Sequence, residues 1–494
     1  MKIRMIYTGA PATPEELLDA KKAQEQRICE LLEYGRTICE SPESGQDTHK
    51  TPKSGQGICP ADGGSEFSLL RFSINTAGAL KKFPLLISAF EEGLAGIRSL
   101  LSPEQILFFE ESRKHTGPLA FFLVRQDSRT LKTRLVAVEE SHPLGRLFNM
   151  DILTSDGHSV SRSELGLPER TCIICGESAG RCIQSQAHST ELLQWRTAQM
   201  LNDYFRARSA DQIAACAVRS LLYEVSSTPK PGLVDRNNSG SHRDMNFFTF
   251  LDSSAALIPW FRDFYCIGWD YADDSAPELF SRLRFAGRQA ETHMFSATGG
   301  INTHKGLVFA FAILCGALGK LHAGQEHSIT RRSLLSVSQK LGACALTDFD
   351  KMKFSAAGYP MTAGERFHSS YGITGARGEA ASGFPSALKL GLPALKKWLS
   401  LGFTLNDAAA LSILSLLAQV DDTNMIHRGG KEEADARKKE AQRLLNEITP
   451  ENFKEKLTAL DLSYIQGNLS PGGCADLLAV SLIFYFLEIN GILV

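Results

Sequence analysis

The chain lacks the features that mark membrane, secreted and nucleic-acid-binding proteins. Its most apolar stretches, residues 307–319 and 477–487, are shorter than the roughly 20 residues that span a bilayer, so we expect buried helices and no membrane partner. No apolar segment follows Lys2 and Arg4, so we expect no secretory signal. The net charge at pH 7 is only −2, and we therefore expect no nucleic-acid partner.

A disulfide framework is missing as well. The eleven cysteines are an odd number, and they are scattered through 494 residues. This usage is typical of reduced thiols, so we expect a cytoplasmic protein. The rest of the composition is ordinary, with 43% hydrophobic and 22% charged residues. A chain of this length and composition is expected to form two to four domains with buried cores.

The spacing of apolar residues changes near residues 190–205. Before this point, residues 67–74, 119–124 and 133–138 are predicted to be strands, and residues 84–101 a helix. These elements indicate a mixed α and β domain. After it, amphipathic helical patterns follow one another with almost no strand pattern, which indicates an all-α domain.

The predicted fold is therefore multidomain, with an N-terminal α+β domain followed by an all-α helical domain. We place the first domain in residues 1–195 and the second in residues 205–494. The first helix is predicted to begin at Pro14, because Thr13 and Glu16 form a capping-box pattern. Residues 36–66 are rich in Ser, Gly, Pro and charge without an apolar period, so they are predicted to be a flexible insertion.

Five glycine-rich loops that carry charge separate the predicted helices of the second domain. They are residues 228–244, 297–306, 372–379, 421–430 and 468–476. Taken singly, each loop is better explained by helix capping and a tight turn. Five such loops in one helical domain instead predict a pocket for a polyphosphate and a divalent metal ion, since helix N-termini and cationic side chains bind phosphate.

Residue types suggest individual roles in this pocket. Glu379 is a candidate acid or base, and the hard oxygen atoms of Asp422 and Asn424 suit Mg²⁺. The remaining candidates would bind the nucleotide substrates. They are Lys230, Asp235, His304, Lys305, Arg377 and Arg428.

These loops resemble the triphosphoribosyl-dephospho-CoA synthases. The matching segments are residues 228–245, 297–306, 374–379, 422–430 and 470–478, and the resemblance covers about residues 205–494 in order. The resemblance implies that ATP and 3′-dephospho-CoA are the substrates and that free adenine is released. The dephospho-CoA ribose hydroxyl would attack C1′ of the ATP ribose, while Mg²⁺ and cationic side chains hold the retained triphosphate.

Two groups of residues in the N-terminal domain suggest chemistry. Asn149 and Asp151 lie on one face of a predicted strand, where Asp151 could hold Mg²⁺ and take part in catalysis with Arg146, and with Lys81 as a weaker candidate. A solvated aspartate at a strand edge explains the same pattern. The second group has the side-chain types of zinc ligands, and consists of Cys172, Cys175, Cys182 and His188. Its spacing is not that of a common zinc finger, so zinc and a cluster of reduced thiols both stay open.

Residues 13–193 resemble the citrate lyase holo-acyl-carrier synthases, which are apo-citrate lyase phosphoribosyl-dephospho-CoA transferases. The matching segments are residues 145–152, 165–168 and 172–188. The resemblance implies that a serine of the acyl-carrier (gamma) subunit of citrate lyase attacks the α-phosphorus and that pyrophosphate leaves. The chain departs from the family pattern at Asn149, where the family has Asp, and at residues 77–81, where the family has Pro-Gly-Pro-x-Lys.

Two alternatives stay open, and these departures motivate the first of them. In the first, only the C-terminal synthase is fully active and the N-terminal part is a module that docks the carrier. In the second, the pair serves malonate decarboxylase, whose carrier uses the same prosthetic group.

Overall fold

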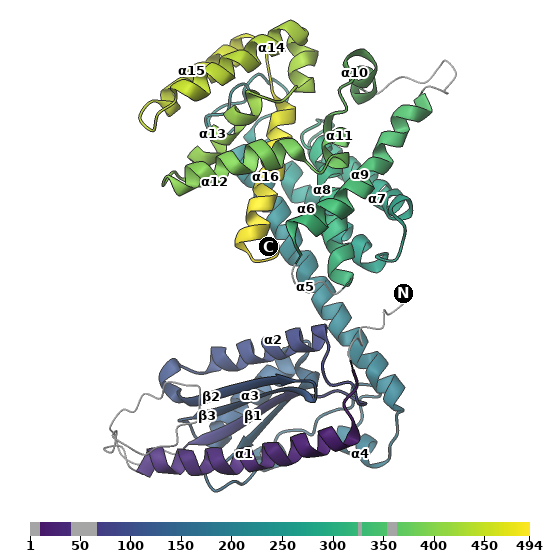
Figure 1. Cartoon of the computed structure of the whole chain (residues 1–494), viewed down its shortest axis with the longest axis vertical. Coiled ribbons are helices and arrows are strands. Elements are labelled where there is room, and N and C mark those ends of the chain that lie inside the picture. The colour runs from purple at the N-terminus through teal and green to yellow at the C-terminus, as the bar shows by residue number, and fades with distance from the viewer. Residues whose placement is uncertain (1–9, 41–66, 325–328, 353–362) are drawn as a thin grey trace. The chain divides into compact units, whose positions relative to one another are not determined.

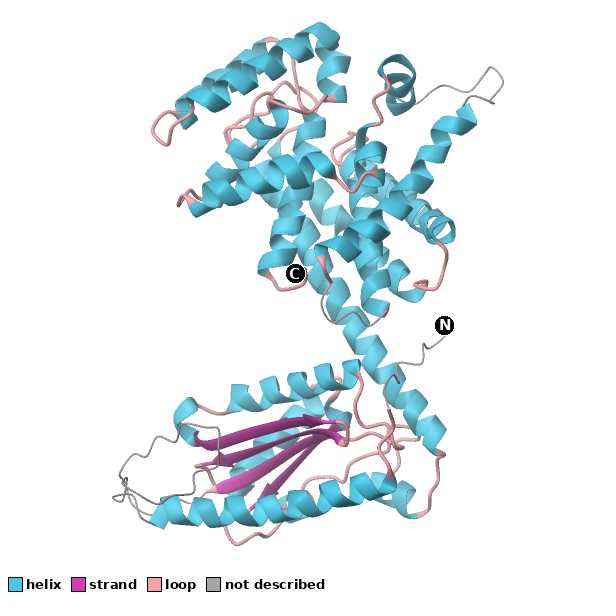
Figure 2. Cartoon of the chain, viewed as in Figure 1, coloured by secondary structure: helices cyan, strands magenta, loops and turns pink. Residues whose placement is uncertain are grey.

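The chain divides into two compact units, Met1–Phe205 and Arg206–Val494. The computed structural model describes residues 10–40, 67–324, 329–352 and 363–494 (Figure 1). Within these residues, strands occur only in the first unit, and the second unit consists of helices and loops (Figure 2). Helix α5 (Thr190–Ser226) belongs to both units, because it carries the chain through the boundary.

The first unit is built on a four-stranded antiparallel sheet with the strand order β2-β3-β1-β4. The strands are β1 (Ser68–Ile74), β2 (Ile106–Lys114), β3 (Gly117–Val124) and β4 (Phe148–Leu153). Four further helices belong to this unit, namely α1 (Pro14–Glu40), α2 (Pro84–Leu100), α3 (Ser128–Ser141) and α4 (Ala179–Gln184). The strands at residues 67–74 and 119–124 and the helix at 84–101 are thus confirmed.

Helices cover both faces of this sheet (Figure 1). On one face, Phe72 of β1 and Phe122 of β3 pack with the buried side chains of α2 and α3. On the other face, Leu69 and Leu123 pack against Leu31 of α1. Because side chains alternate along a strand, every second position of β1 and β4 faces α1. This register fixes the face on which the polar residues of β4 lie.

Helix α1 begins as the sequence predicts. The backbone N–H of Thr13 donates to Glu16 (2.7 Å), and that of Glu16 donates to the Thr13 hydroxyl (3.2 Å). The helix continues through Glu40, so it includes the first five residues of the segment that we expected to be a flexible insertion. The rest of that expectation, residues 41–66, lies outside the described residues.

The prediction of a strand at residues 133–138 is wrong, because these residues lie within α3. The β-branched residues of this segment favour a strand locally. Asp127, however, caps the helix by accepting a hydrogen bond from the Thr130 N–H (2.8 Å). Leu131 and Leu135, four residues apart, are then both buried against the sheet, and this packing outweighs the local preference. Strand β2 was not predicted.

The second unit contains the C-terminal part of α5 and the helices that follow it. These are α6 (Phe247–Asp270), α7 (Ala276–Ala297), α8 (Lys305–Ala323), α9 (Arg331–Met352), α10 (Ala363–Tyr371), α11 (Gly375–Ala381), α12 (Leu392–Ser400), α13 (Leu405–Leu417), α14 (Thr423–Glu447), α15 (Phe453–Gln466) and α16 (Gly472–Ile489). A π-helical segment, Ala387–Gly391, leads into α12. The helical character predicted for this part of the chain is confirmed.

Helices α8 and α16 form the centre of the second unit. Both are long and apolar enough to cross a membrane, but 78% of the apolar window of α8 and 61% of that of α16 are buried inside the protein. Packing within the unit therefore accounts for their composition. This agrees with the prediction that both stretches are buried helices.

Glycines let α8 approach α6 closely. A Cβ atom at Gly319 would lie 2.0 Å from the carbonyl oxygen of Tyr265, and one at Gly268 would lie 2.0 Å from that of Gly316. Real Cβ atoms do not approach backbone atoms so closely, so the two helices can cross at this distance only with glycine at the crossing.

We expect Gly319→Ala to lower the free energy of unfolding of the second unit by about 1–3 kcal/mol, because the new methyl group overpacks the crossing. Gly287→Ala in α7 is a matched control, since no atom beyond the neighbouring backbone of its own helix lies within 4 Å of its Cβ position. The control should be neutral or gain about 0.5–1 kcal/mol from the better helix propensity of Ala. Urea unfolding followed by circular dichroism measures both, and equal stability of the two variants would contradict the close crossing.

Candidate functional site

A cavity of about 970 Å³ opens in the second unit where several helices begin. Its walls include the first residues of α8, α11, α14 and α16, and all five glycine-rich loops contribute to it. The N–H groups in the first turn of a helix have no partner within the helix, and the helix dipole adds partial positive charge there. Several helix N-termini around one cavity suit a ligand with many negative charges.

The start of α8 forms one wall. His304 is almost completely buried, and its Nδ1 lies 2.7 Å from the Ser253 hydroxyl. Its Nε2 has no hydrogen-bond partner among the described residues. Burial and the nearby charge of Lys230 lower the pKa of His304 to about 3, so the ring is neutral at physiological pH. The Lys305 ammonium group lies 3.2 Å from Glu291 and is half exposed.

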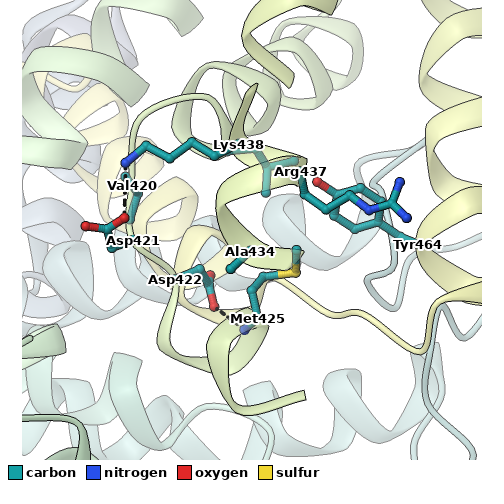
Figure 3. A pocket seen from close by; sticks show the side chains of 9 residues that line it. Val420, Asp421, Asp422, Met425, Ala434, Arg437, Lys438 and Tyr464 are labelled. Carbon is teal, nitrogen blue, oxygen red and sulfur yellow. Dashed lines mark hydrogen bonds and ion pairs between the residues drawn. The ribbon is translucent and has the colours of Figure 1, made fainter. Parts of the chain in front are cut away.

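Asp422 joins the starts of two helices. Its Oδ1 accepts the backbone N–H groups of Asn424 (2.8 Å) and Met425 (3.1 Å) in the first turn of α14. Its Oδ2 accepts the N–H of Cys474 (2.7 Å) in the first turn of α16. Figure 3 shows Asp422 turned toward the nitrogen of Met425, whereas Asp421 is turned toward Lys438. Asn424 lines the cavity and is exposed to it.

The predicted loop at residues 421–430 is mostly the first part of α14. The backbone leaves the helical conformation at Gly430, where φ is 82°. Asp422, Asn424 and Arg428 are therefore held on a helical turn that begins at the cavity, which fixes their positions more tightly than a loop would.

Two further carboxyl groups face the cavity. Glu224 of α5 is buried and forms an ion pair with Lys230, which is also buried. Asp476 lies just after the first turn of α16 and accepts no hydrogen bond from any described residue, and a Cβ atom at Gly306 would lie 2.2 Å from its Oδ2. Burial, followed by the charges of Glu224 and Asp422, raises the pKa of Asp476 well above its usual value.

The oxygen chemistry of these groups matches Mg²⁺. Carboxylate and amide oxygens are its preferred protein ligands. Both oxygens of Asp422 already accept backbone N–H groups, whereas the Asp476 carboxylate is uncommitted. A cation beside Asp476 would also relieve the repulsion among three neighbouring carboxyl groups. Sequence reasoning gave Asp476 no site role. It also missed Glu224, and the only sign of that residue in the sequence is that it is acidic within an otherwise apolar helical segment.

Glu379 lies on α11 and lines the cavity from another side. Its carboxylate accepts hydrogen bonds from the Ser386 hydroxyl (2.6 Å) and the Ser386 backbone N–H (3.2 Å). Burial raises the pKa of Glu379, although these two hydrogen bonds act in the opposite direction. A carboxyl group whose pKa is raised keeps its proton to a higher pH than usual and can give it to a leaving group.

Arg428 connects three of the five loops. Its guanidinium group donates to the carbonyl oxygen of Ser241 (3.0 Å) and to the side chain of Asn468 (3.3 Å), and lies 3.3 Å from Nδ1 of His242. His242 Nε2 in turn lies 2.8 Å from the Ser470 hydroxyl. Arg428 thus lines the cavity and at the same time orders the loops around it.

Three of the predicted nucleotide-binding residues do not line this cavity. Lys230 lies behind Glu224, and Asp235 accepts the backbone N–H groups of Lys230 (3.2 Å), Asn237 (2.7 Å) and Asn238 (3.0 Å). Asp235 thereby holds the shape of its loop. Arg377 is half-buried on α11 and is absent from the cavity wall.

In the first unit, the polar residues of β4 lie on the face that is covered by α1. Asp151 is opposite Arg71 of β1, and Oδ2 of Asp151 accepts from Arg71 Nη2 (2.6 Å) and from Asn149 Nδ2 (2.9 Å). Sequence reasoning missed Arg71, because only the register of the strands brings it beside Asp151. The carboxylate that we predicted to bind Mg²⁺ is thus already paired with a cation.

Arg146 is half-buried in the turn Gly145–Leu147, which leads into β4. Burial, followed by the nearby charges of Arg170 and Arg162, lowers the pKa of Arg146. Both of these arginines form ion pairs with Glu139. Lys81 donates to the carbonyl oxygen of Thr76 (2.5 Å), and burial lowers its pKa.

Comparison with known proteins assigns families to both units. Residues 210–492 match the family described as ATP:dephospho-CoA triphosphoribosyl transferase, and residues 63–204 match apo-citrate lyase phosphoribosyl-dephospho-CoA transferase. A relative from Haemophilus influenzae, named "Protein CitXG", is 34% identical over 435 residues, which is 86% of this chain and 91% of the relative. The chain belongs to the ATP:dephospho-CoA triphosphoribosyl transferase family. The second match makes it a bifunctional transferase.

Other relatives match most of this chain or only a part of it. "Protein CitXG" of Leuconostoc mesenteroides subsp. cremoris is 34% identical over 429 residues, covering 83% of this chain and 89% of that protein. A "Probable 2-(5''-triphosphoribosyl)-3'-dephosphocoenzyme-A synthase" of Streptococcus equi subsp. zooepidemicus is 42% identical over 291 residues. That match covers 56% of this chain but 97% of the Streptococcus protein, so it is confined to one part of this chain.

We expect Arg428→Lys to loosen the loops at residues 228–244 and 468–476, because a single ammonium group cannot reach the acceptors of both loops as the guanidinium group does. Amide hydrogen exchange at residues 238–244 and 468–472 should become at least several-fold faster. Arg443→Lys is the matched control, since Arg443 is exposed on the same helix. Unchanged exchange in Arg428→Lys would mean that the loops hold their shape without the guanidinium group.

Proposed function

We propose that the chain makes 2′-(5″-triphosphoribosyl)-3′-dephospho-CoA and attaches it to the citrate lyase acyl carrier. In the first step, unit 2 joins ATP to 3′-dephospho-CoA and releases adenine. In the second, unit 1 transfers the product to a serine of the carrier and releases pyrophosphate. The observation that carries the first step is the cavity, which combines several helix N-termini with a protonatable carboxyl group. Free cysteines and a need for ATP fit a cytoplasmic location.

Glu379 is proposed as the acid that protonates the leaving adenine. The bond between C1′ and the adenine nitrogen breaks as the ribose hydroxyl of dephospho-CoA attacks, and this centre carries oxocarbenium character. A protonated Glu379, oriented by Ser386, can supply the proton that adenine needs, and the proton lost by the attacking hydroxyl would return Glu379 to its acid form. Nearby carboxylates such as Glu224 would stabilise positive charge at C1′.

The triphosphate is proposed to lie against the starts of α8 and α16. Lys305 and the free N–H groups of these first turns would bind its oxygens. Asp476 and Asn424 would hold Mg²⁺, with Asp422 fixing their positions through the two helix starts that it caps. Bound Mg²⁺ would neutralise the triphosphate, which stays intact in this step.

Transfer to the carrier is proposed to occur at β4 of unit 1. Arg71 and Arg146 would bind the phosphates, and Asp151 would hold a metal ion once the phosphates draw Arg71 away. The neutral amide of Asn149 is a weaker ligand than the Asp that is usual in this family. The substrate's own oxygens must then complete the metal site. Assays with the apo-carriers of citrate lyase and of malonate decarboxylase separate the two acceptors.

We expect Glu379→Gln to lower the rate of adenine release from ATP in the presence of dephospho-CoA by about 10²–10⁴, because a transition-state proton donor is lost. ATP binding should change little. The wild-type rate should fall as the pH rises through the raised pKa of Glu379, and this fall should be absent in the variant. Adenine is measured by chromatography and ATP affinity by calorimetry.

Loss of ATP binding with an unchanged turnover would instead place Glu379 at the metal ion. No adenine release by the wild-type chain would overturn the proposed first step.

We expect Asn149→Asp to lower the Mg²⁺ concentration needed for carrier modification, because it restores a second anionic ligand. Asp151→Asn should abolish modification. Adenine release is the internal control, and it should be unchanged in both variants because that chemistry belongs to unit 2. Mass gain of the carrier across a Mg²⁺ titration reports the result. An active Asp151→Asn, or an unchanged Mg²⁺ requirement in Asn149→Asp, would remove the metal role from β4.

A further inference from the structure

Three cysteines and one histidine that follow β4 in the sequence lie close together in unit 1. Their ligand atoms, the Sγ atoms of Cys172, Cys175 and Cys182 and a ring nitrogen of His188, all lie within 4.8 Å of one another. Cys175 Sγ lies 3.5 Å from Cys182 Sγ and 3.4 Å from His188 Nε2. From this geometry, we propose that unit 1 holds a structural zinc ion bound by these four residues.

The separations match a tetrahedral zinc site. Zn–S bonds of about 2.3 Å and Zn–N bonds of about 2.0 Å, arranged tetrahedrally, place two sulfurs about 3.8 Å apart and a sulfur and a nitrogen about 3.5 Å apart. A disulfide would instead join two sulfurs at about 2.05 Å and would leave the other two groups without a role. Thiolate and imidazole ligands select zinc over Mg²⁺, which prefers oxygen.

The backbone supports the ligands as in a metal-binding turn. The N–H of Ile174 points to Cys172 Sγ (3.4 Å), and such donors stabilise a metal-bound thiolate. Gly176 follows Cys175 with φ of 78°, a conformation that favours glycine, and lets the chain turn back. On the other side, Cys182 lies on α4, and His188 lies two residues before α5.

This part of the chain has no apolar core of its own. From residue 161 to residue 196, no side chain is buried. Ile183 of α4 is 76% exposed. A segment that buries so little apolar surface needs a cross-link or a metal ion to hold one conformation. Four protein ligands close the coordination shell, so the ion would act in structure and not in catalysis.

The zinc ion would also position an arginine beside β4. Arg170, two residues before Cys172, donates to the carbonyl oxygen of Phe148 at the start of β4 (2.6 Å) and pairs with Glu139. Arg196 of α5 donates to the carbonyl oxygen of Ile173 (3.2 Å). The metal-bound turn therefore connects the start of β4 with the start of α5.

The test is the metal content of the full chain. The protein is purified without added metal, and its metals are measured by inductively coupled plasma mass spectrometry. We expect about one zinc per chain in the wild type and in Cys29→Ser, a control that replaces an exposed cysteine of the same unit outside the cluster. Cys175→Ser should lose the zinc. Wild-type protein that is metal-free with reactive thiols, contains iron instead, or carries a Cys175–Cys182 disulfide overturns the proposal. So does zinc that is retained in Cys175→Ser.

A second measurement keeps the test decisive if Cys175→Ser does not fold. Wild-type chain loaded with Co²⁺ in place of zinc should show the visible absorption of a tetrahedral cobalt–thiolate site. Removing the metal with a chelator should speed tryptic cleavage after Arg170 and Arg181 at least several-fold, while cleavage sites in unit 2 are unaffected. No cobalt–thiolate absorption, or cleavage that is indifferent to the chelator, contradicts a zinc ion that orders this segment.

Discussion

The cavity of unit 2 depends on one carboxylate that joins two helix starts. Asp422 accepts N–H groups from the first turns of both α14 and α16, so these helices must begin at the same point. Its burial makes this arrangement costly to disturb, because each N–H group would lose its partner away from water. With the two starts fixed, Asn424, Arg428 and Asp476 reach the cavity from defined positions. Arg428 then ties the loop at residues 228–244 to these helix starts.

Charge in the cavity is balanced by helix geometry. The wall carries the carboxyl groups of Glu224, Glu379 and Asp476, but the helix starts around it present N–H groups and partial positive charge. A ligand with phosphate oxygens can accept hydrogen bonds from the N–H groups of the helix starts. A divalent cation and an ionisable leaving group on the same ligand can interact with the carboxyl groups. ATP together with Mg²⁺ has this composition, so the site geometry and the family assignment point to the same substrate.

Local sequence predicted the elements well where one local signal dominates. The capping box at Thr13 and Glu16 and the apolar helices α8 and α16 are present as expected. Residues 133–138 were mistaken for a strand, because β-branched side chains suit strands until a cap at Asp127 and packing on the sheet favour a helix. The site residues were chosen by chemical type, and type alone cannot separate a metal ligand from a helix cap. Asp422 caps two helices, and the metal-ligand role that its type suggested stays a prediction.

The sequence by itself determined the family, the chemical types of the candidate site residues and the order of the loops that carry them. These are local properties, written in short motifs and in the period of apolar residues. Tertiary structure alone decided which groups meet. The strand register placed Arg71 on Asp151, and the paths of α5 and α16 brought Glu224 near Asp476. Such meetings join residues that are far apart in the chain, and their positions follow from how helices and strands pack, which no short window of sequence contains.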